Sequence, residues 1–223
     1  MKLRKFPHDF FPFNMSVFEK PFRFNRLPTE CLTLPSNAVL GCDIQNSDVL
    51  KSRADDLRVE NETDKNIILE NTSPQDNRFK PFFMRDCKSV IVCSSVCVGS
   101  AQVVNCSGGS IDRLVSKGSV SLTSCNDMKI SGWCSQLRLT DCKNIQISFQ
   151  TASSTALVNC RDICVLPPHV VQPESVADDL LRQAGLNTAA YLDSFKWMDI
   201  ADFDSLPGTA KNFTLRDPCS NRV

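Results

Sequence analysis

Five segments share one pattern and recur about every 18 residues: MRDCKS (84–89), VVNCSG (103–108), LTSCND (122–127), LTDCKN (139–144) and LVNCRD (157–162). In each segment a short apolar run leads to a cysteine, and a polar corner follows it. The cysteines Cys87, Cys106, Cys125, Cys142 and Cys160 are 19, 19, 17 and 18 residues apart. A fixed period is typical of stacked repeats, and this one is too short for two helices and a turn. The stretch 82–165 therefore predicts an all-β fold, a right-handed parallel β-helix (solenoid).

The rest of the chain divides into regions on either side of this β-helix. Residues 36–166 are predicted to form the β-helix, and Asn61 is expected to take the corner position that cysteine takes in later coils. Residues 1–35 are a Phe/Pro-rich N-terminal arm, with seven of the 14 phenylalanines in the first 24 positions. Prolines at 7, 12, 21 and 28 exclude a long helix there. We interpret the arm as irregular chain packed on the β-helix, with a partner-binding segment as the alternative.

Residues 167–223 are predicted to form a helical cap and a C-terminal tail. Pro167 and Pro168 end the strand pattern, and residues 173–184 have the apolar spacing of a helix that stops before Gly185. The open end of a β-helix needs a cover, so this helix is expected to cap it.

Composition excludes several classes of partner. The 25 basic and 25 acidic residues cancel, so no net charge favours nucleic acid or an anionic membrane. No window approaches the roughly 18 consecutive apolar residues of a membrane span. Lys2 occupies the position where N-terminal myristoylation requires glycine. The sequence predicts a soluble, intracellular protein that does not span a membrane.

The 12 cysteines could indicate disulfides, but their period favours another interpretation. Cysteines that recur with the strands predict a ladder of small, buried, reduced side chains. No metal site is predicted, because the chain has only two histidines, His8 and His169, and no Cys-x-x-Cys pair.

The segment WCSQLRLTDC (133–142) carries the candidate site. Strand alternation places Leu137 and Leu139 on one face and Gln136, Arg138 and Thr140 on the other. With the leucines buried, an amide and a guanidinium would project together from a rigid surface. Taken alone, this pattern is more simply a solvated polar face. No hydrolase elbow or phosphate-binding loop occurs elsewhere.

Several motifs, in order, resemble the tubulin-binding-cofactor-C domain family (C-CAP/cofactor C-like). That family includes cofactor C and the retinitis pigmentosa protein that activates Arl-type GTPases. The segment CSQLR followed by the Asp-Cys corner is similar to the family's Cys-Gln-Gln-Leu/Phe-Arg signature. KGSV (117–120), QAGL (183–186) and WxxIxDF (197–203) resemble further family motifs. The resemblance covers about residues 35 to 215.

The resemblance implies a GTPase activator rather than an enzyme with its own substrate. Arg138 matches the family's arginine finger, supplied in trans, and Gln136 matches a supporting glutamine. The partner interface is then expected around Ser135, Thr140, Gln146 and Ser148. Structural roles are expected for the five repeat cysteines and for Trp197, Asp202 and Phe203. The protein would hold no cofactor of its own, since GTP and Mg²⁺ belong to the partner.

The resemblance leaves the partner and the activity open. The GTPase would be β-tubulin with the tubulin-folding cofactors, or an Arl-type small GTPase. The alternative is a non-catalytic cytoskeletal or centrosomal scaffold of the same fold. Ser135 replaces the first glutamine of the signature, which would weaken or remove one hydrogen bond to the partner. A cytoplasmic location is implied, at the cytoskeleton, centrosome or cilium and basal body.

Overall fold

The computed structural model describes residues 47–51, 57–70, 79–168, 176–192, 194–205 and 210–216. The chain divides into two units, Met1–Val39 and Leu40–Val223, and every described residue belongs to the second. The arm predicted over residues 1–35 lies outside the described residues.

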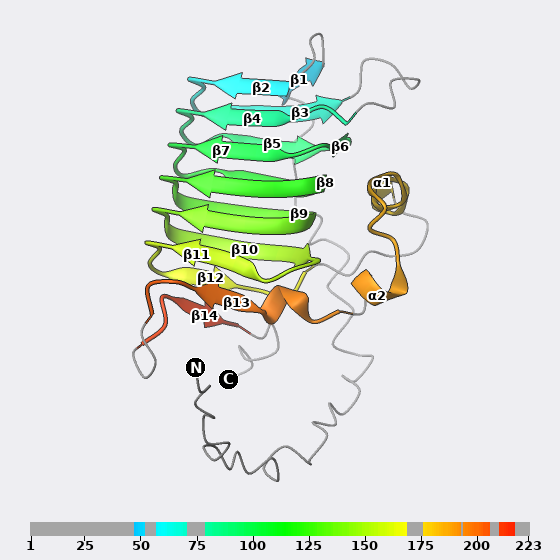
Figure 1. Ribbon diagram of the computed structural model, residues 1–223. Coiled ribbons are helices and arrows are strands. Elements are labelled where there is room, and N and C mark those ends of the chain that lie inside the picture. Colours follow the sequence, from blue (N-terminus) through cyan, green and yellow to red (C-terminus); the bar gives the residue numbers. More distant parts are fainter. Residues whose placement is uncertain are drawn as a thin grey trace, which may run out of the picture. The chain divides into compact units, whose positions relative to one another are not determined.

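The described strands form a right-handed parallel β-helix, as predicted (Figure 1). Its strands are β1 (Ser47–Lys51), β2 (Leu57–Glu60), β3 (Asn66–Glu70), β4 (Phe82–Arg85), β5 (Ile91–Ser94), β6 (Cys97–Val98), β7 (Ala101–Val104), β8 (Ser110–Thr123), β9 (Asn126–Thr140), β10 (Lys143–Thr151), β11 (Thr155–Val158), β12 (Ile163–Val165), β13 (Ile200–Asp202) and β14 (Phe213–Leu215). Each strand pairs in parallel with strands of the adjacent coils.

Each coil passes through three surfaces. We call the outward side of β2, β4, β7, the second halves of β8 and β9, β11 and β13 the open face. The opposite face consists of β1, β3, β5, the first halves of β8 and β9, β10, β12 and β14. Between them, β6 pairs with the middle of β8, and this short surface is the helix-covered side. Strands β8 and β9 are long because each continues from the opposite face to the open face.

The corner before each repeat cysteine has a left-handed backbone. The residue preceding each repeat cysteine has a φ between 50° and 55°: Asp86, Asn105, Ser124, Asp141 and Asn159. Asn61, which precedes Glu62 in an earlier coil, has a φ of 58°. Asn and Asp tolerate this conformation better than other side chains do, which explains their recurrence in the pattern. Glu60 pairs with Arg85, so Asn61 aligns with Asp86 and Glu62 with Cys87. Our placement of Asn61 at the cysteine position was therefore wrong by one residue.

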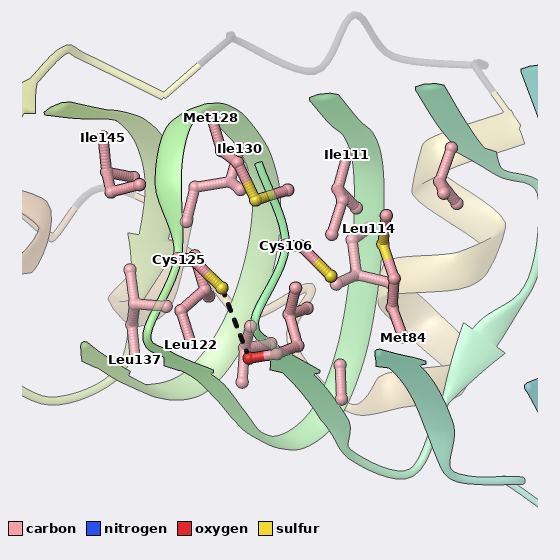
Figure 2. Close-up of a cluster of buried hydrophobic side chains, with 14 of the residues drawn as sticks. Met84, Cys106, Ile111, Leu114, Leu122, Cys125, Met128, Ile130, Leu137 and Ile145 are labelled. Atoms are coloured by element: carbon pink, nitrogen blue, oxygen red, sulfur yellow. Dashed lines mark hydrogen bonds between the residues drawn. The ribbon is translucent and has the colours of Figure 1, made fainter. Parts of the chain in front are cut away.

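The repeat cysteines form the predicted ladder of buried side chains. All five are free thiols, at most 2% exposed. Each thiol donates to the carbonyl two residues earlier, as Cys125 does to Thr123 at 3.4 Å. Figure 2 shows Cys125 among buried aliphatic side chains, with a further hydrogen bond to the Val103 carbonyl at 3.6 Å. Sulfur contacts with Cys106 and Cys142, together with burial, raise the pKa of Cys125, which keeps this thiol protonated. Outside the ladder, Cys93 is disulfide-bonded.

The helices lie beside the β-helix, so the prediction that they cap its end is wrong. They are α1 (Val176–Ala184), α2 (Ala189–Leu192) and the 3₁₀ turn η4 (Lys196–Met198). Figure 1 shows α1 next to the coils of β6 and β8, far from the last strands. It packs there because the helix-covered side is apolar, with Cys97, Val115 and Trp133 pointing outward. The chain instead continues the β-helix at this end, since β13 pairs with β11 and β14 with β12.

No helix among the described residues is long and apolar enough to cross a membrane.

Candidate partner-binding site

Strand β9 brings the candidate site to the open face by bending twice. Its first half pairs with β10 on the opposite face, and its second half pairs with β11. The first bend lies at Gly132, where a Cβ would be 2.0 Å from the Leu114 carbonyl oxygen, so only glycine fits. The second lies at Ser135, where β8 uses two residues, Lys117 and Gly118, and β9 uses one. Gln136 is the first residue beyond this second bend.

The predicted alternation around Arg138 is present. Leu137 and Leu139 are fully buried in the core, whereas Gln136 and Arg138 are exposed. Strand β9 is paired on both sides here, with Ser121 and Ala156 flanking Arg138 in register. The two leucines and the two ladders hold the backbone of Arg138 rigidly, while its small neighbours leave the guanidinium uncovered.

Arg138 differs from another arginine on the same line of the open face. Arg58 lies 4.8 Å from the ring centroid of Phe83 and bonds to Glu60 at 3.4 Å. The Arg138 guanidinium has no hydrogen-bond, ion-pair or ring partner within the described part of the chain, and neither has the Gln136 amide. A free guanidinium on a rigid strand is available to an anionic group of another molecule.

Ser135 has an internal role at the bend. Its hydroxyl donates to the Lys117 carbonyl at 2.6 Å, and its own carbonyl accepts from Ala152 N at 3.2 Å and from Ser153 Oγ at 3.2 Å. The side chain that replaces the first glutamine of the signature thus ties β9 to the preceding coil.

Of the four predicted interface residues, the structure places Ser135 and Thr140 next to Arg138 but not Gln146 or Ser148. Gln146 aligns with Lys129 and Cys164 on the opposite face. Ser148 is buried and donates to the Pro167 carbonyl at 2.8 Å. The expectation that they share the face of Arg138 is corrected, because the Asp141–Cys142 corner turns the chain away before β10 begins.

The three residues predicted to be structural behave differently from one another. Trp197 packs against the core and is partly buried. Asp202 accepts hydrogen bonds from Ser205 Oγ and from Asn212 N at 3.0 Å, which joins β13 to the segment before β14. Phe203 is 69% exposed, so its ring does not pack in the core, and its structural role stays a prediction. Its N–H donates to the Leu157 carbonyl, and this pairing continues the register of β13 on the open face.

Sequence reasoning missed the neighbours of Arg138, although a signal for them was present. Arg138, Ser121, Ala156, Gln102 and Phe83 each lie four residues before a repeat cysteine. In the structure these positions align in one line across the open face. Counting back from each cysteine would therefore have found them. Counting forward would have shown that Gln146, four residues after Cys142, belongs elsewhere.

The described residues contain no group of three or more His, Cys, Asp or Glu side chains placed to hold a metal ion.

Comparison with known proteins identifies a family. Residues 79–203, more than half of the chain, match the family model described as tubulin binding cofactor C. Among solved structures, tubulin binding cofactor C from Leishmania major matches with a TM-score of 0.43 and 16% sequence identity, over 61% of this chain and 78% of that chain. Among curated proteins no match is found.

Proposed function

Since this chain belongs to the tubulin binding cofactor C family, we propose that it activates GTP hydrolysis by tubulin, supplying Arg138 in trans as an arginine finger. GTP and Mg²⁺ would be bound by the partner. An Arl-type small GTPase is the alternative partner for the same chemistry. A tubulin partner would place this activity in the cytoplasm, at the cytoskeleton, whereas a centrosomal or ciliary location stays a prediction.

The proposed chemistry needs a cation at the phosphates. During phosphoryl transfer, negative charge spreads over the transferred phosphate and the leaving oxygen. A planar guanidinium that is always charged can bond to two of these oxygens at once. Arginine fingers of this kind contribute roughly 10³ to 10⁵ in rate. Gln136, two residues away on the same side of β9, would donate its amide to the partner or to the attacking water.

One observation carries the proposal: the Arg138 guanidinium is exposed and has no partner among the described residues, on a strand whose backbone is paired on both sides. A finger on a loop would lose conformational entropy when it binds, whereas this strand is already ordered. A scaffold surface would need no unpaired arginine beside a free amide.

The rest of the open face suits contact with a globular partner. Ser121 and Ala156 flank Arg138 in register, and Ser119 pairs with Gln136; all three are small, so a partner surface can approach closely. Phe203 continues the line of Thr140 and Val158 and exposes its ring on the same side. Exposed aromatic rings are frequent anchors at interfaces, so we place Phe203 in the proposed contact surface.

Single-turnover GTP hydrolysis tests the proposal. The reaction would be followed for tubulin with its folding cofactors and for Arl-type GTPases, with wild-type protein and Arg138→Ala. We expect stimulation by the wild type and a loss of about 10³-fold or more in the variant, with partner binding retained. Arg161→Ala removes an exposed arginine at a corner outside the open face, and it should act like wild type.

Two results would contradict the proposal. Equal stimulation of GTP hydrolysis by the wild type and by Arg138→Ala would show that Arg138 is not an arginine finger. Binding to tubulin without stimulation of any of these GTPases would support the scaffold of the same fold instead.

A further inference from the structure

The hydroxyl of Tyr191 reaches from α2 to the bend of β9 that precedes Gln136. It lies 3.0 Å from the Cys134 carbonyl oxygen and 2.7 Å from the Gln150 carbonyl oxygen. Cys134 lies two residues before Gln136, and Gln150 lies in the adjacent coil, where its neighbour Thr151 pairs with Cys134. The single O–H therefore bridges the carbonyl groups of two consecutive coils at the same bend.

This contact belongs to a buried polar network. Tyr191, the only tyrosine of the chain, is 7% exposed, and Gln150 is 3% exposed. The Gln150 amide donates back to the Tyr191 carbonyl at 2.6 Å and to the Ser194 carbonyl and hydroxyl, both at 2.9 Å. Burial raises the pKa of Tyr191, so its hydroxyl remains a donor at every pH at which the protein would be studied. A buried network of hydrogen bonds of this kind favours one arrangement of the groups it joins.

The bend is also one of the two points at which the pairing between β8 and β9 is irregular. The register between β8 and β9 shifts between the Ser116–Cys134 pair and the Ser119–Gln136 pair, so the ladder is interrupted there. Side-chain hydrogen bonds cross this interruption: the Ser135 hydroxyl donates to the Lys117 carbonyl of β8, and the Tyr191 hydroxyl donates to the Cys134 carbonyl of β9 and the Gln150 carbonyl of β10. Gln136 and Arg138 follow this bend along β9, so the direction of the bend determines the positions of their Cα atoms on the open face.

We propose that Tyr191 is a positioning residue: its hydrogen bond to Cys134 holds the bend of β9 so that Gln136 and Arg138 meet the partner in one geometry. This inference rests on the proposed function, and it adds that α2 contributes to the site from outside the β-helix. A displacement of about 1 Å in a group that stabilises a transition state can cost about 10²-fold in rate. Loss of the hydroxyl should therefore reduce the rate of the bound complex more than its affinity.

The test uses Tyr191→Phe, which keeps the ring in its place and removes only the hydroxyl. Backbone amide hydrogen exchange is the first measurement, since it needs no partner. We expect the amides of residues 135–138 to exchange about tenfold faster than in the wild type, with residues 126–132 unchanged. Single-turnover GTP hydrolysis at saturating partner is the second measurement. We expect a rate about tenfold lower, at an unchanged half-saturating concentration.

Ser194→Ala is the matched control. It removes a hydroxyl from the same network but leaves the bond between Tyr191 and Cys134, so both measurements should equal those of the wild type. Trp133 packs against α1, so its fluorescence would report whether this helix remains packed on the β-helix in both variants.

Three results would overturn the inference. They are wild-type exchange at residues 135–138 in Tyr191→Phe, an increase in exchange along the whole of β9, and an unchanged hydrolysis rate despite faster local exchange. If the wild-type protein stimulates no GTPase, the proposed function fails, and the exchange measurement alone decides whether Tyr191 holds the bend.

Discussion

Strand β9 exposes different chemistry on the two surfaces that it crosses, and the two residues that show this lie five positions apart. Trp133 points outward on the helix-covered side and is only 6% exposed, because it packs among Leu180, Leu181, Ala184 and Leu186. Arg138 points outward on the open face and has no partner among the described residues. Both positions lie on the outside of the same coil. The β-helix alone therefore does not determine whether an outward side chain is buried or exposed. That depends on whether another segment of the chain packs against it.

The comparison also separates stability from function. The helix-covered side contributes apolar burial in addition to the interior core, while the open face contributes very little. Outward residues of the open face are small or polar near Arg138. We therefore expect substitutions on the helix-covered side to change the free energy of unfolding, and those on the open face to change activity.

The largest expected effect on stability belongs to Trp133→Ala. Removing this ring should lower the free energy of unfolding by about 3–5 kcal/mol, because its loss leaves a cavity under α1. Arg138→Ala should change it by less than about 0.5 kcal/mol, since an exposed and unpaired side chain contributes little. Urea denaturation of both variants measures the difference. Similar values for the two would show that the surfaces are not distinct.

A smaller effect is expected from Gly118→Ala, at the bend between the two surfaces. A Cβ at this position would lie 2.6 Å from the Gly99 carbonyl oxygen, closer than non-bonded atoms approach. The coils must move apart to admit it, which should cost about 1–3 kcal/mol in the free energy of unfolding. Ser119→Ala, at the next and exposed position, should be nearly neutral, and the same denaturation curves compare the two. If Gly118→Ala left the free energy of unfolding unchanged, the coils at this bend would be able to adjust to the added Cβ without cost.

The smallest effect concerns Asp202, in the last described coil of the open face. Partial burial raises the pKa of this carboxyl, but hydrogen bonds from Ser205 and Asn212 outweigh it and hold the pKa below its ordinary value. Stability from these bonds is thus present above the pKa of the unfolded chain, and it is lost as the pH falls through the folded value.

Asp202→Asn should therefore be less stable than wild type at about pH 7, by less than about 1 kcal/mol because its hydrogen bonds are only partly buried. The difference should shrink as the pH falls towards about 3, close to and below the ordinary aspartate pKa. Urea denaturation across this range measures it. A difference that does not vary with pH would show that the charge of Asp202 is not involved.

Much of the fold followed from local pattern. The cysteine period predicted the stacked coils, and strand alternation predicted buried Leu137 and Leu139 beside exposed Gln136 and Arg138. The helix that ends at Gly185 was also predicted, from its apolar spacing and its stop. These features depend on the backbone geometry of a few consecutive residues, and such geometry repeats whenever the pattern repeats.

What surrounds the site was not predicted in the same way. Gln146 and Ser148 lie close to Arg138 along the chain, but a corner separates them from it in space. Phe203 was given a structural role on the strength of a motif, and the motif did not show that the residue is exposed.

By itself the sequence determined the coil, its ladder of cysteines and the outward direction of Arg138, because these follow from side chains that alternate along a strand and from corners that need Asn or Asp. Only the tertiary structure decided that the helices cover the side rather than the end, that Ser135 bonds to Lys117, and that Tyr191 reaches the bend of β9. These contacts join residues far apart in the chain: Tyr191 lies 57 residues after Cys134, and α1 packs against the still earlier strand β6. Such contacts depend on how whole coils and helices fit together, and no local period of the chain contains that information.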